Sequence, residues 1–360
     1  MLCLGIESSC DDTSLALVRD GELLAQESAS QVDVHALFGG VVPEMASREH
    51  ARFIGPLFDR LMQSGGVSPA DLDVVAVARG PGLLGSLLVG VAFAKALALG
   101  TGARLIGVNH LHAHFFAAGL QGEMQFPALG LLVSGGHTQL CRLDGYNEVR
   151  CLGKTLDDAA GEAFDKAGKM LGLPYPAGRL MDELAERGRA DAGLFPRPYT
   201  GNASLDFSFS GLKTAMQTYI AAHSGLVTSW DAASGAIAGD KGQALADVCA
   251  SYRLAVVETL TLKTRQALLM REMQDIRSLV LAGGVAANSL LRKSLEKLAE
   301  ERGLAFAVPS IALCTDNGAM VAWLGWKLSM LGYAHELQLE AVSRGRIIPN
   351  DMRLLVAATG

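Results

Sequence analysis

Two similar β-hairpin patterns, one near the N-terminus and one further along the chain, constrain the fold more than any other feature of the sequence. In the first, apolar strands at residues 2–6 and 14–18 flank a small, polar tip. In the second, strands at residues 128–133 and 138–143 flank a tight, glycine-rich turn. One pattern that recurs in two halves of a chain indicates an internal duplication. We therefore expect two related lobes, each built on its own sheet.

Strand and helix patterns alternate between and after these hairpins. Residues 74–78 are apolar and β-branched, residues 83–98 follow a helical pattern, and residues 105–108 return to a strand. A second unit of this kind has a strand at residues 278–282 and a helix at about residues 288–302. Such alternation predicts an α/β protein in which helices cover a mixed sheet.

The length of 360 residues also favours two lobes, because single cores stop growing at roughly 250–300 residues. We predict a first lobe at residues 1–110, completed by a C-terminal helix at about 316–345, and a second lobe at residues 111–315. Residues of about 155–265 show long helical periods without convincing strands, which predicts a helical insertion in the second lobe. Within it, residues 221–241 are small and polar and predict a surface loop.

Composition excludes several classes of protein. Half of the residues are apolar and the charged fraction is 19%, which argues against disorder. The six cysteines form no CxxC pair, so reduced, buried thiols in a cytosolic protein are expected. The N-terminus lacks a basic region before Glu7, which argues against a signal peptide. The apolar segment 80–102 contains Lys95 and six glycines, and a buried helix explains it better than a membrane span.

A histidine cluster is the sharpest candidate for chemistry. Three of the eight histidines, His110, His112 and His114, fall within five residues. If a helix begins here, His110 and His114 lie one turn apart on one face and can share a metal ion, whereas His112 points roughly the other way. A zinc protease of the His-Glu-x-x-His type is disfavoured, because Leu111 stands where that motif has its general base.

Two imidazoles need a third ligand, and Asp316 is a candidate. It lies in a polar turn before the apolar helix predicted at residues 319–331. A carboxylate at a helix N-terminus is also favoured for purely structural reasons, and the residues alone favour that explanation. A set of two histidines and one carboxylate suits iron(II), zinc or similar ions.

Two glycine pairs predict an anion site. Gly135-Gly136 and Gly283-Gly284 each end an apolar strand, where backbone N–H groups can face an anion without obstruction. Asn288 can then cap the next helix or bind a base or ribose. Ordinary turn glycines are about as good an explanation for either pair alone.

Two further motifs are explained by local structure. Residues 80–85 match G-x-G-x-x-G, but no acid follows the next strand, so a tight strand-to-helix turn is favoured over a dinucleotide site. Residues 155–166 predict a helix capped by Thr155, with Asp157 and Asp158 near its N-terminus.

These motifs, in this order over about residues 2–330, closely resemble the bacterial tRNA N6-adenosine threonylcarbamoyltransferases, the TsaD family once called Gcp or O-sialoglycoprotein endopeptidase. The resemblance implies a two-lobed actin/Hsp70/hexokinase-like (ASKHA) α/β fold, with duplicated five-stranded mixed sheets flanked by helices. The matching segments are residues 5–12, 39–48, 80–83, the His110/His114 pair, 133–139, 157–166, 206–214, 282–288 and 314–319.

The resemblance also implies a site. One divalent ion, usually taken as Fe²⁺ with Zn²⁺ as the other option, would be held by His110, His114 and Asp316, which reverses the capping interpretation of Asp316. Asp11 could orient the reacting amine or take its proton. The implied substrate-binding residues are Val133, Ser134, Gly135, Gly136, His137, Asp165, Gly178, Asp182 and Asn288.

The implied reaction transfers threonylcarbamoyl from threonylcarbamoyl-AMP to N6 of adenosine 37 in tRNAs that read ANN codons. Partners would be TsaB and the ATPase TsaE, in the cytoplasm and away from membranes. A metallo-endopeptidase and a sugar-kinase or chaperone-like ATPase of the same fold remain alternatives. The net charge of −6 predicts weak tRNA binding by the chain alone, so partners would have to help the basic residues Arg48, Arg52, Arg197 and Lys213.

Overall fold

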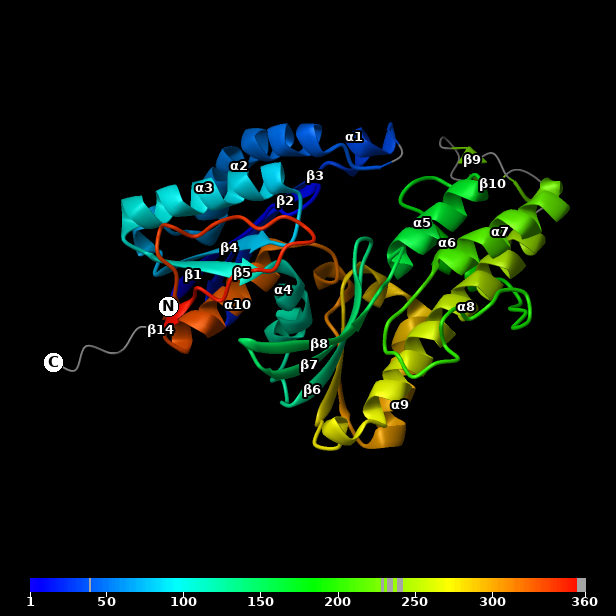
Figure 1. Ribbon diagram of the computed structural model, residues 1–360. Helices are drawn as coiled ribbons and strands as arrows, with labels where there is room; N and C mark the ends of the chain where they lie inside the picture. Colours follow the sequence, from blue (N-terminus) through cyan, green and yellow to red (C-terminus); the bar gives the residue numbers. More distant parts are fainter. Residues whose placement is uncertain (39, 228–229, 232–235, 238–241, 355–360) are drawn as a thin grey trace. The chain divides into compact units, whose positions relative to one another are not determined.

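The computed structural model divides into two compact units (Figure 1). One comprises Met1–Met124 and Ala312–Gly360, and the other comprises Gln125–Ile311. Residues 111–124 and 312–315 therefore belong with the first unit, although the sequence places them in the second lobe. The structure describes residues 1–38, 40–227, 230–231, 236–237 and 242–354, so parts of the surface loop predicted at 221–241 and the end of the tail lie outside the described residues.

The first unit is built on a five-stranded mixed sheet with the order β3-β2-β1-β4-β5. Strand β1 pairs antiparallel with β2 and parallel with β4. Strand β2 pairs antiparallel with β3, and β4 pairs parallel with β5. The strands are β1 (Leu2–Glu7), β2 (Asp12–Arg19), β3 (Glu22–Ser30), β4 (Val74–Gly80) and β5 (Arg104–Asn109).

The second unit repeats this arrangement with the order β12-β11-β6-β7-β8. Strand β6 pairs antiparallel with β7 and parallel with β11, as β1 does with β2 and β4. The predicted fold class of two five-stranded mixed sheets flanked by helices is therefore confirmed. The strands are β6 (Ala128–Val133), β7 (Thr138–Gly145), β8 (Glu148–Lys154), β11 (Ser278–Ala282) and β12 (Ala305–Ala307).

Helices cover both faces of the first sheet, with α2 and α3 on one side and α10 on the other (Figure 1). Leu4 and Ile6 of β1 join the core under α2 and α3. Gly5, between them, faces α10, where an added Cβ would come within 2.3 Å of the Ala322 nitrogen. Helix and strand backbones therefore meet directly at this glycine. The helices are α1 (Val32–Ala36), α2 (Pro43–Gly65), α3 (Leu84–Thr101), α4 (His110–Phe116) and α10 (Gly318–Met330).

The helices of the second unit fall largely in the predicted insertion. The first begins at Ala160, so the predicted start at Thr155 is wrong. The Thr155 hydroxyl instead donates to the Asp158 carbonyl, which makes a turn ahead of the helix. The helices are α5 (Ala160–Met170), α6 (Gly178–Ala185), α7 (Ser210–Ala222), α8 (Gly242–Leu268) and α9 (Ser289–Arg302).

Short elements complete the described chain. The two-residue strands are β9 (Trp230–Asp231), β10 (Ala236–Ile237), β13 (Tyr333–Ala334) and β14 (Arg353–Leu354). The 3-10 turns are η1 (Pro69–Asp71), η2 (Ala117–Leu120), η3 (Ser224–Leu226), η4 (Arg271–Met273), η5 (Gly284–Ala287) and η6 (Ile311–Leu313).

Helix α3 corresponds to the apolar segment noted in the sequence. It is the one helix, among those in the described part, that is long and apolar enough to cross a membrane. A core helix of a globular protein meets the same criterion, and α3 packs on β4 and α2. Its opposite face leaves Leu84, Leu88 and Leu99 exposed.

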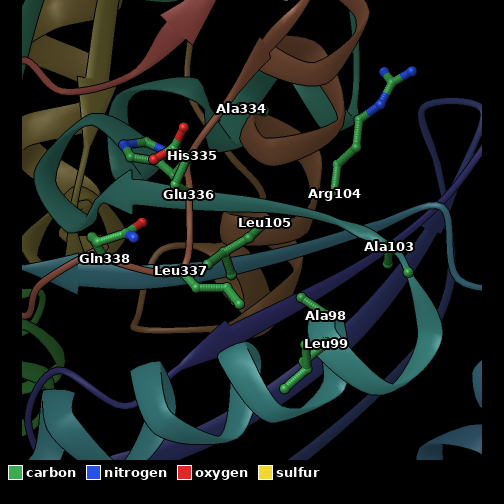
Figure 2. A pocket seen from close by; sticks show the side chains of 11 residues that line it. Ala98, Leu99, Ala103, Arg104, Leu105, Ala334, His335, Glu336, Leu337 and Gln338 are labelled. Carbon is green, nitrogen blue, oxygen red and sulfur yellow. The ribbon is translucent and has the colours of Figure 1, made fainter.

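The segment after α10 packs on the first unit. The buried Arg79 guanidinium forms two hydrogen bonds to Asp351, at 2.5 and 3.1 Å, and His335 Nδ1 accepts from the Gly107 N–H at 3.1 Å. Between this segment, β5 and the end of α3 lies a cavity of about 600 Å³, lined by apolar side chains and by the polar Arg104, His335, Glu336 and Gln338 (Figure 2). It contains none of the predicted site residues.

Candidate metal centre

The histidine cluster lies at the junction of β5 and α4. The Asn109 side chain accepts hydrogen bonds from the backbone N–H groups of Leu111, at 2.9 Å, and His112, at 3.3 Å. Asn109 is therefore the N-cap, and the helix begins at His110. The predicted helical spacing of His110 and His114 is confirmed, because both lie in α4 one turn apart.

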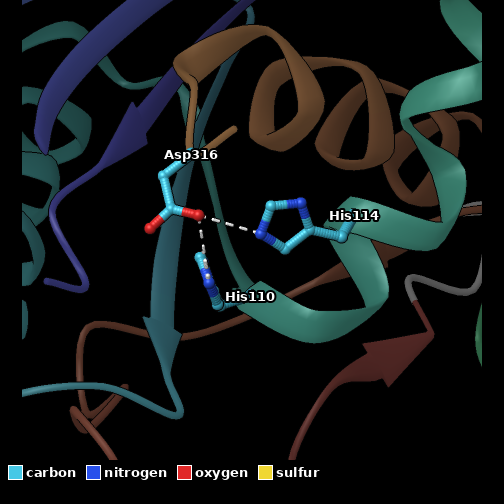
Figure 3. A group of neighbouring side chains, drawn as sticks. All are labelled: His110, His114 and Asp316. Carbon is cyan, nitrogen blue, oxygen red and sulfur yellow. Dashed lines mark hydrogen bonds and ion pairs between the residues drawn. The ribbon is translucent and has the colours of Figure 1, made fainter. Parts of the chain in front are cut away.

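Asp316 does not cap α10. The N-cap is Asn317, whose side-chain oxygen accepts from the Met320 N–H at 2.9 Å. The Asp316 carboxylate instead lies 2.9 Å from His114 Nε2 and 3.7 Å from His110 Nε2 (Figure 3). The capping explanation is thus wrong, and the three residues implied by the family resemblance come together.

The donor set fits a metal ion. Ligand atoms of His110, His114 and Asp316 all lie within 4.8 Å of one another. The imidazole rings stand at 82° to each other, and both Nε2 atoms are directed at one carboxylate oxygen. Both histidines are buried, whereas the Asp316 side chain is partly exposed. A site of this composition can hold one divalent ion with open positions.

A buried acid contacts His110 on Nδ1, the ring nitrogen that faces away from Asp316. Glu7, fully buried at the end of β1, lies 2.9 Å from His110 Nδ1, and its other oxygen accepts from the Ser9 N–H at 2.6 Å. Burial disfavours the charged imidazole, but the carboxylates of Glu7 and Asp316 outweigh it and raise the pKa of His110 to about 9. A carboxylate on the nitrogen that faces away from an ion fixes the tautomer and orientation of a metal-binding histidine.

His112, Asp11 and Asp12 lie near the candidate metal centre but are not among its clustered ligand atoms. Burial lowers the pKa of His112 to about 4. Asp11 lies in the loop between β1 and β2, next to Asp12. Burial, with the charges of Asp11 and Asp316, raises the pKa of Asp12 to about 6, against a hydrogen bond from Ser30. The loop therefore carries acids in the electrostatic field of the candidate metal centre.

In the second unit, the turn after β6 is closed by its own hydrogen bonds. The Ser134 N–H donates to the His137 carbonyl at 2.8 Å, and the His137 N–H donates to the Ser134 hydroxyl at 3.1 Å. Gly283, with φ of 88°, packs against the Val133 carbonyl, where an added Cβ would lie at 2.5 Å. The two predicted glycine turns thus lie side by side at the ends of β6 and β11.

Four other predicted substrate-binding residues form two pairs. The Asp165 carboxylate accepts from the Ala177 N–H at 2.8 Å and from the N–H of Gly178. The Asp182 carboxylate accepts from the Asn288 amide at 2.8 Å, and the Asn288 oxygen caps α9. Both ends of the Asn288 amide are therefore engaged within the protein.

Three comparisons with known proteins bear on this arrangement. The family model for tRNA N6-adenosine threonylcarbamoyltransferase, TsaD, matches residues 22–323. The protein of that name from Nitratidesulfovibrio vulgaris strain DP4 is 60% identical over 354 residues, which cover 98% of each chain. The one from Lawsonia intracellularis is 51% identical over 98% of this chain and 99% of its own.

The chain belongs to the TsaD family.

Solved structures agree on the fold. HypF from T. kodakarensis is 15% identical, with a TM-score of 0.56 over 91% of this chain and 48% of its own. Component A of the (R)-2-hydroxyglutaryl-CoA dehydratase of Acidaminococcus fermentans is 13% identical, with a TM-score of 0.51 over 92% of this chain and 99% of its own. At this identity, the likeness supports the ASKHA-type fold alone.

Three residues of this TsaD-family chain escape sequence reasoning. Glu7 and Ser9 both contact His110 Nδ1, and Arg253 donates to Asp182 at 2.8 Å. The one signal for Glu7 is an acid that ends a continuous apolar strand, since a buried carboxylate needs partners. Arg253 lies inside a long helix without any local signal.

Proposed function

We propose that this protein transfers threonylcarbamoyl from threonylcarbamoyl-AMP to N6 of adenosine 37 in tRNAs that read ANN codons, with release of AMP. Family membership along nearly the whole chain carries this proposal. The convergence of His110, His114 and Asp316 supports it, because these positions match the ligand set that the resemblance implies.

His110, His114 and Asp316 would hold one divalent ion, with Fe²⁺ as the first choice and Zn²⁺ as the second. When bound, the ion would act as a Lewis acid toward oxygens of the activated substrate. Glu7 keeps the proton of His110 on Nδ1, so that the Nε2 lone pair is free for coordination. Asp316 supplies the single carboxylate and lowers the net charge of the centre.

The second unit would bind the nucleotide part of the substrate. Backbone N–H groups in the turn Ser134-Gly135-Gly136-His137, which follows Val133, would face the phosphate. No atom lies within 4 Å of an added Cβ at Gly135, so the turn is open on that side. The site would be completed by Asp165, Gly178, Asp182 and Asn288. Hydrogen bonds within the protein hold these residues in place before the substrate binds.

Asp11 would orient the N6 amine or accept its proton. The amine is a weak nucleophile, and the phosphate of AMP is a good leaving group, so removal of the amine proton is the step in which the chain's own carboxylates can assist. The anticodon loop is single-stranded, and its bases can enter a pocket without disruption of a duplex.

TsaB and TsaE are the proposed protein partners, and the cytoplasm is the proposed location. Exposed leucines on α3 support a protein contact there, because Leu84, Leu88 and Leu99 share one face of the helix and remain in solvent. Leu88→Glu should weaken binding to TsaB, whereas Glu44→Lys on α2 should not. Equal binding by both variants would show that TsaB does not contact this face of α3.

Reconstitution tests the reaction. The purified chain with TsaB, TsaE, threonylcarbamoyl-AMP and unmodified tRNA should yield the modified nucleoside and AMP, measured by mass spectrometry. The double substitution His110→Ala and His114→Ala should abolish both products. Full activity of this variant would rule out the metal role, and cleavage of casein or steady ATP turnover without tRNA would favour the protease or ATPase alternatives.

A further inference from the structure

Two cysteines face each other across β7 and β8, apart from the residues assigned to the metal and the substrate. The antiparallel register places Cys141 opposite Cys151, next to an irregularity that leaves Leu152 without a partner. Opposed residues in antiparallel strands have Cα atoms about 4.5–5.5 Å apart. Disulfides need about 4.4–6.8 Å, so the pairing already brings the two cysteines within the required distance.

The two thiols differ in access to solvent. Cys141 is buried, at 2% exposure, and Cys151 is the exposed member of the six cysteines. Their other sulfur contacts are long: Cys141 to Gln139 Oε1 at 3.9 Å and Cys151 to the Gly153 carbonyl at 3.6 Å. Neither contact is strong enough to hold its thiol away from the other cysteine.

The electrostatic environment favours Cys151 as the reactive thiol. A hydrogen bond from Cys141 lowers the pKa of Cys151 and outweighs the opposing effect of burial, with help from the Gly153 backbone and Lys154. Burial raises the pKa of Cys3, Cys10 and Cys249, which remain thiols. A thiolate is the form that attacks oxidants, so Cys151 should react before these three.

We propose that Cys141 and Cys151 are a redox modification site, at which a hydroperoxide converts the pair into a reversible cross-strand disulfide. The Cys151 thiolate attacks one peroxide oxygen, the O–O bond breaks, and the hydroxide or alkoxide that leaves takes up a proton. The resulting sulfenic acid is attacked by the Cys141 sulfur; the S–S bond forms, the S–O bond breaks, and water leaves with the Cys141 proton. The two thiols lose two electrons, and the peroxide gains them.

This bond would fix the end of β8. The Lys154 N–H donates to the Asp206 carboxylate at 3.0 Å, and the Lys154 carbonyl accepts from the Phe207 N–H at 3.0 Å. Gly153 packs against the Leu205 carbonyl. A disulfide between Cys141 and Cys151 would therefore link β7 to the end of β8, which contacts the irregular segment 205–207, and oxidation should protect this segment from backbone hydrogen exchange.

Mass spectrometry can test the disulfide directly. Trypsin cleaves after Arg142 and Arg150, which puts the two cysteines into separate peptides, residues 105–142 and 151–154, each with one cysteine. The folded full chain is treated with equimolar hydrogen peroxide and then denatured, its free thiols are alkylated, and it is digested without reductant. We expect one linked species, two hydrogens lighter than the sum of its peptides, that reductant removes, and four alkylated thiols in place of six.

Variants establish the order of the steps. Cys151→Ser should abolish both the link and peroxide consumption, whereas Cys141→Ser should leave a sulfenic acid at Cys151 that dimedone traps. Cys249→Ser, at a buried cysteine in α8, is the matched control and should keep the full yield of the link. Six alkylated thiols in the oxidised wild type, over-oxidation of Cys151 without a link, or a link to another cysteine would each overturn the proposal. None of these outcomes requires a variant to fold.

Discussion

At the scale of single residues, Glu7 sets the tautomer and the orientation of the His110 imidazole. One carboxylate oxygen accepts from the Ser9 N–H and the other faces His110 Nδ1. In Glu7→Gln, the amide oxygen can still accept from Ser9, which leaves the NH₂ group facing Nδ1. His110 would then place its proton on Nε2, the atom directed at Asp316. We expect metal affinity to fall by about 10–100-fold, the usual effect of such a partner.

Chelator competition against the wild type measures this change. The matched control is Glu44→Gln, because Glu44 is 77% exposed and forms an exposed ion pair with Arg48, away from the histidines. Circular dichroism of both variants separates loss of the ion from loss of the fold. Unchanged affinity in Glu7→Gln would mean that His110 does not coordinate through Nε2.

The raised pKa of His110, about 9, predicts opposite pH trends with and without an ion. In the metal-free protein, the native state holds this proton more tightly than the unfolded state, whose pKa is about 6.5. The resulting stability is complete below pH 6.5 and is lost as the pH rises through about 9. Metal affinity should rise over the same range, because the ion displaces the proton.

Thermal unfolding of metal-free protein between pH 6 and 9.5 checks the first trend. The Tm of the wild type should fall over this range, and that of His110→Gln should change less. The ion-loaded protein should show no such fall. A Tm of the metal-free wild type that rises toward pH 9 would contradict the assignment of the proton to His110.

At the scale of elements, Asp157 holds the start of α7 from a distant turn. Its carboxylate accepts from the hydroxyls of Ser208 and Ser210 and from the Phe209 N–H at 2.8 Å. These bonds lower the pKa of Asp157 against the effect of burial. Asp157→Ala should destabilise the protein by about 1–2 kcal/mol, as loss of a helix cap does, in urea unfolding. Glu162→Ala, which removes a half-exposed ion pair to Lys166, should cost less than about 1 kcal/mol; equal losses would refute the capping role.

Capping also marks the limit of prediction from sequence. Asp157 and Asp316 both precede helices, and in the sequence both look suited to the N-terminus of the helix next to them. In the structure, Asn317 caps α10, and Asp316 contacts the two histidines instead. Asp157 accepts hydrogen bonds at the start of α7, a helix that begins more than fifty residues later. Sequence patterns identify residues able to cap, but tertiary contacts decide which helix end they meet.

The strands follow the same principle. β1, β2 and β6 contain continuous apolar runs, as buried strands do, and β7 follows β6 after a tight glycine-rich turn, so the sequence predicts all four. β8 is an edge strand of mixed polarity, and β12 has three half-buried residues. Neither can be predicted from the sequence, since a strand that packs on one side alone leaves a weak pattern. The prediction that six buried thiols occur is also wrong for Cys151, which is exposed on β8.

At the scale of the whole molecule, the topology of the first unit explains why residues far apart in sequence share one site. β1, β5 and α10 all belong to the first unit, and they bring Glu7, His110 and Asp316 together. The recurrent hairpins predict the two sheets, and the spacing of the histidines predicts their shared face. The residues alone offer Asp316 as a third ligand but favour a helix cap, and the family resemblance reverses that choice.

The distribution of charge predicts that the isolated chain holds tRNA weakly. The net charge is −6, and the exposed Arg48 and Arg52 each have a neighbouring glutamate within 4 Å. Arg197 is mostly buried and bonded to Glu258 and two carbonyl groups, so it is already engaged. We expect a Kd for the chain alone no tighter than about 10⁻⁶ M at physiological salt, the range of non-specific binding.

Fluorescence anisotropy with labelled tRNA, at 50 and 200 mM salt, checks this prediction. Binding by the chain alone should weaken steeply between the two salt concentrations, and addition of TsaB and TsaE should tighten it at least tenfold. The double substitution Arg48→Glu and Arg52→Glu should reduce binding by the assembly, whereas Arg265→Glu, on α8 and paired with Glu301, should not. Submicromolar binding by the isolated chain at 200 mM salt would contradict this prediction. It would show that the chain has a local basic surface strong enough to overcome the repulsion between its net negative charge and the tRNA phosphates.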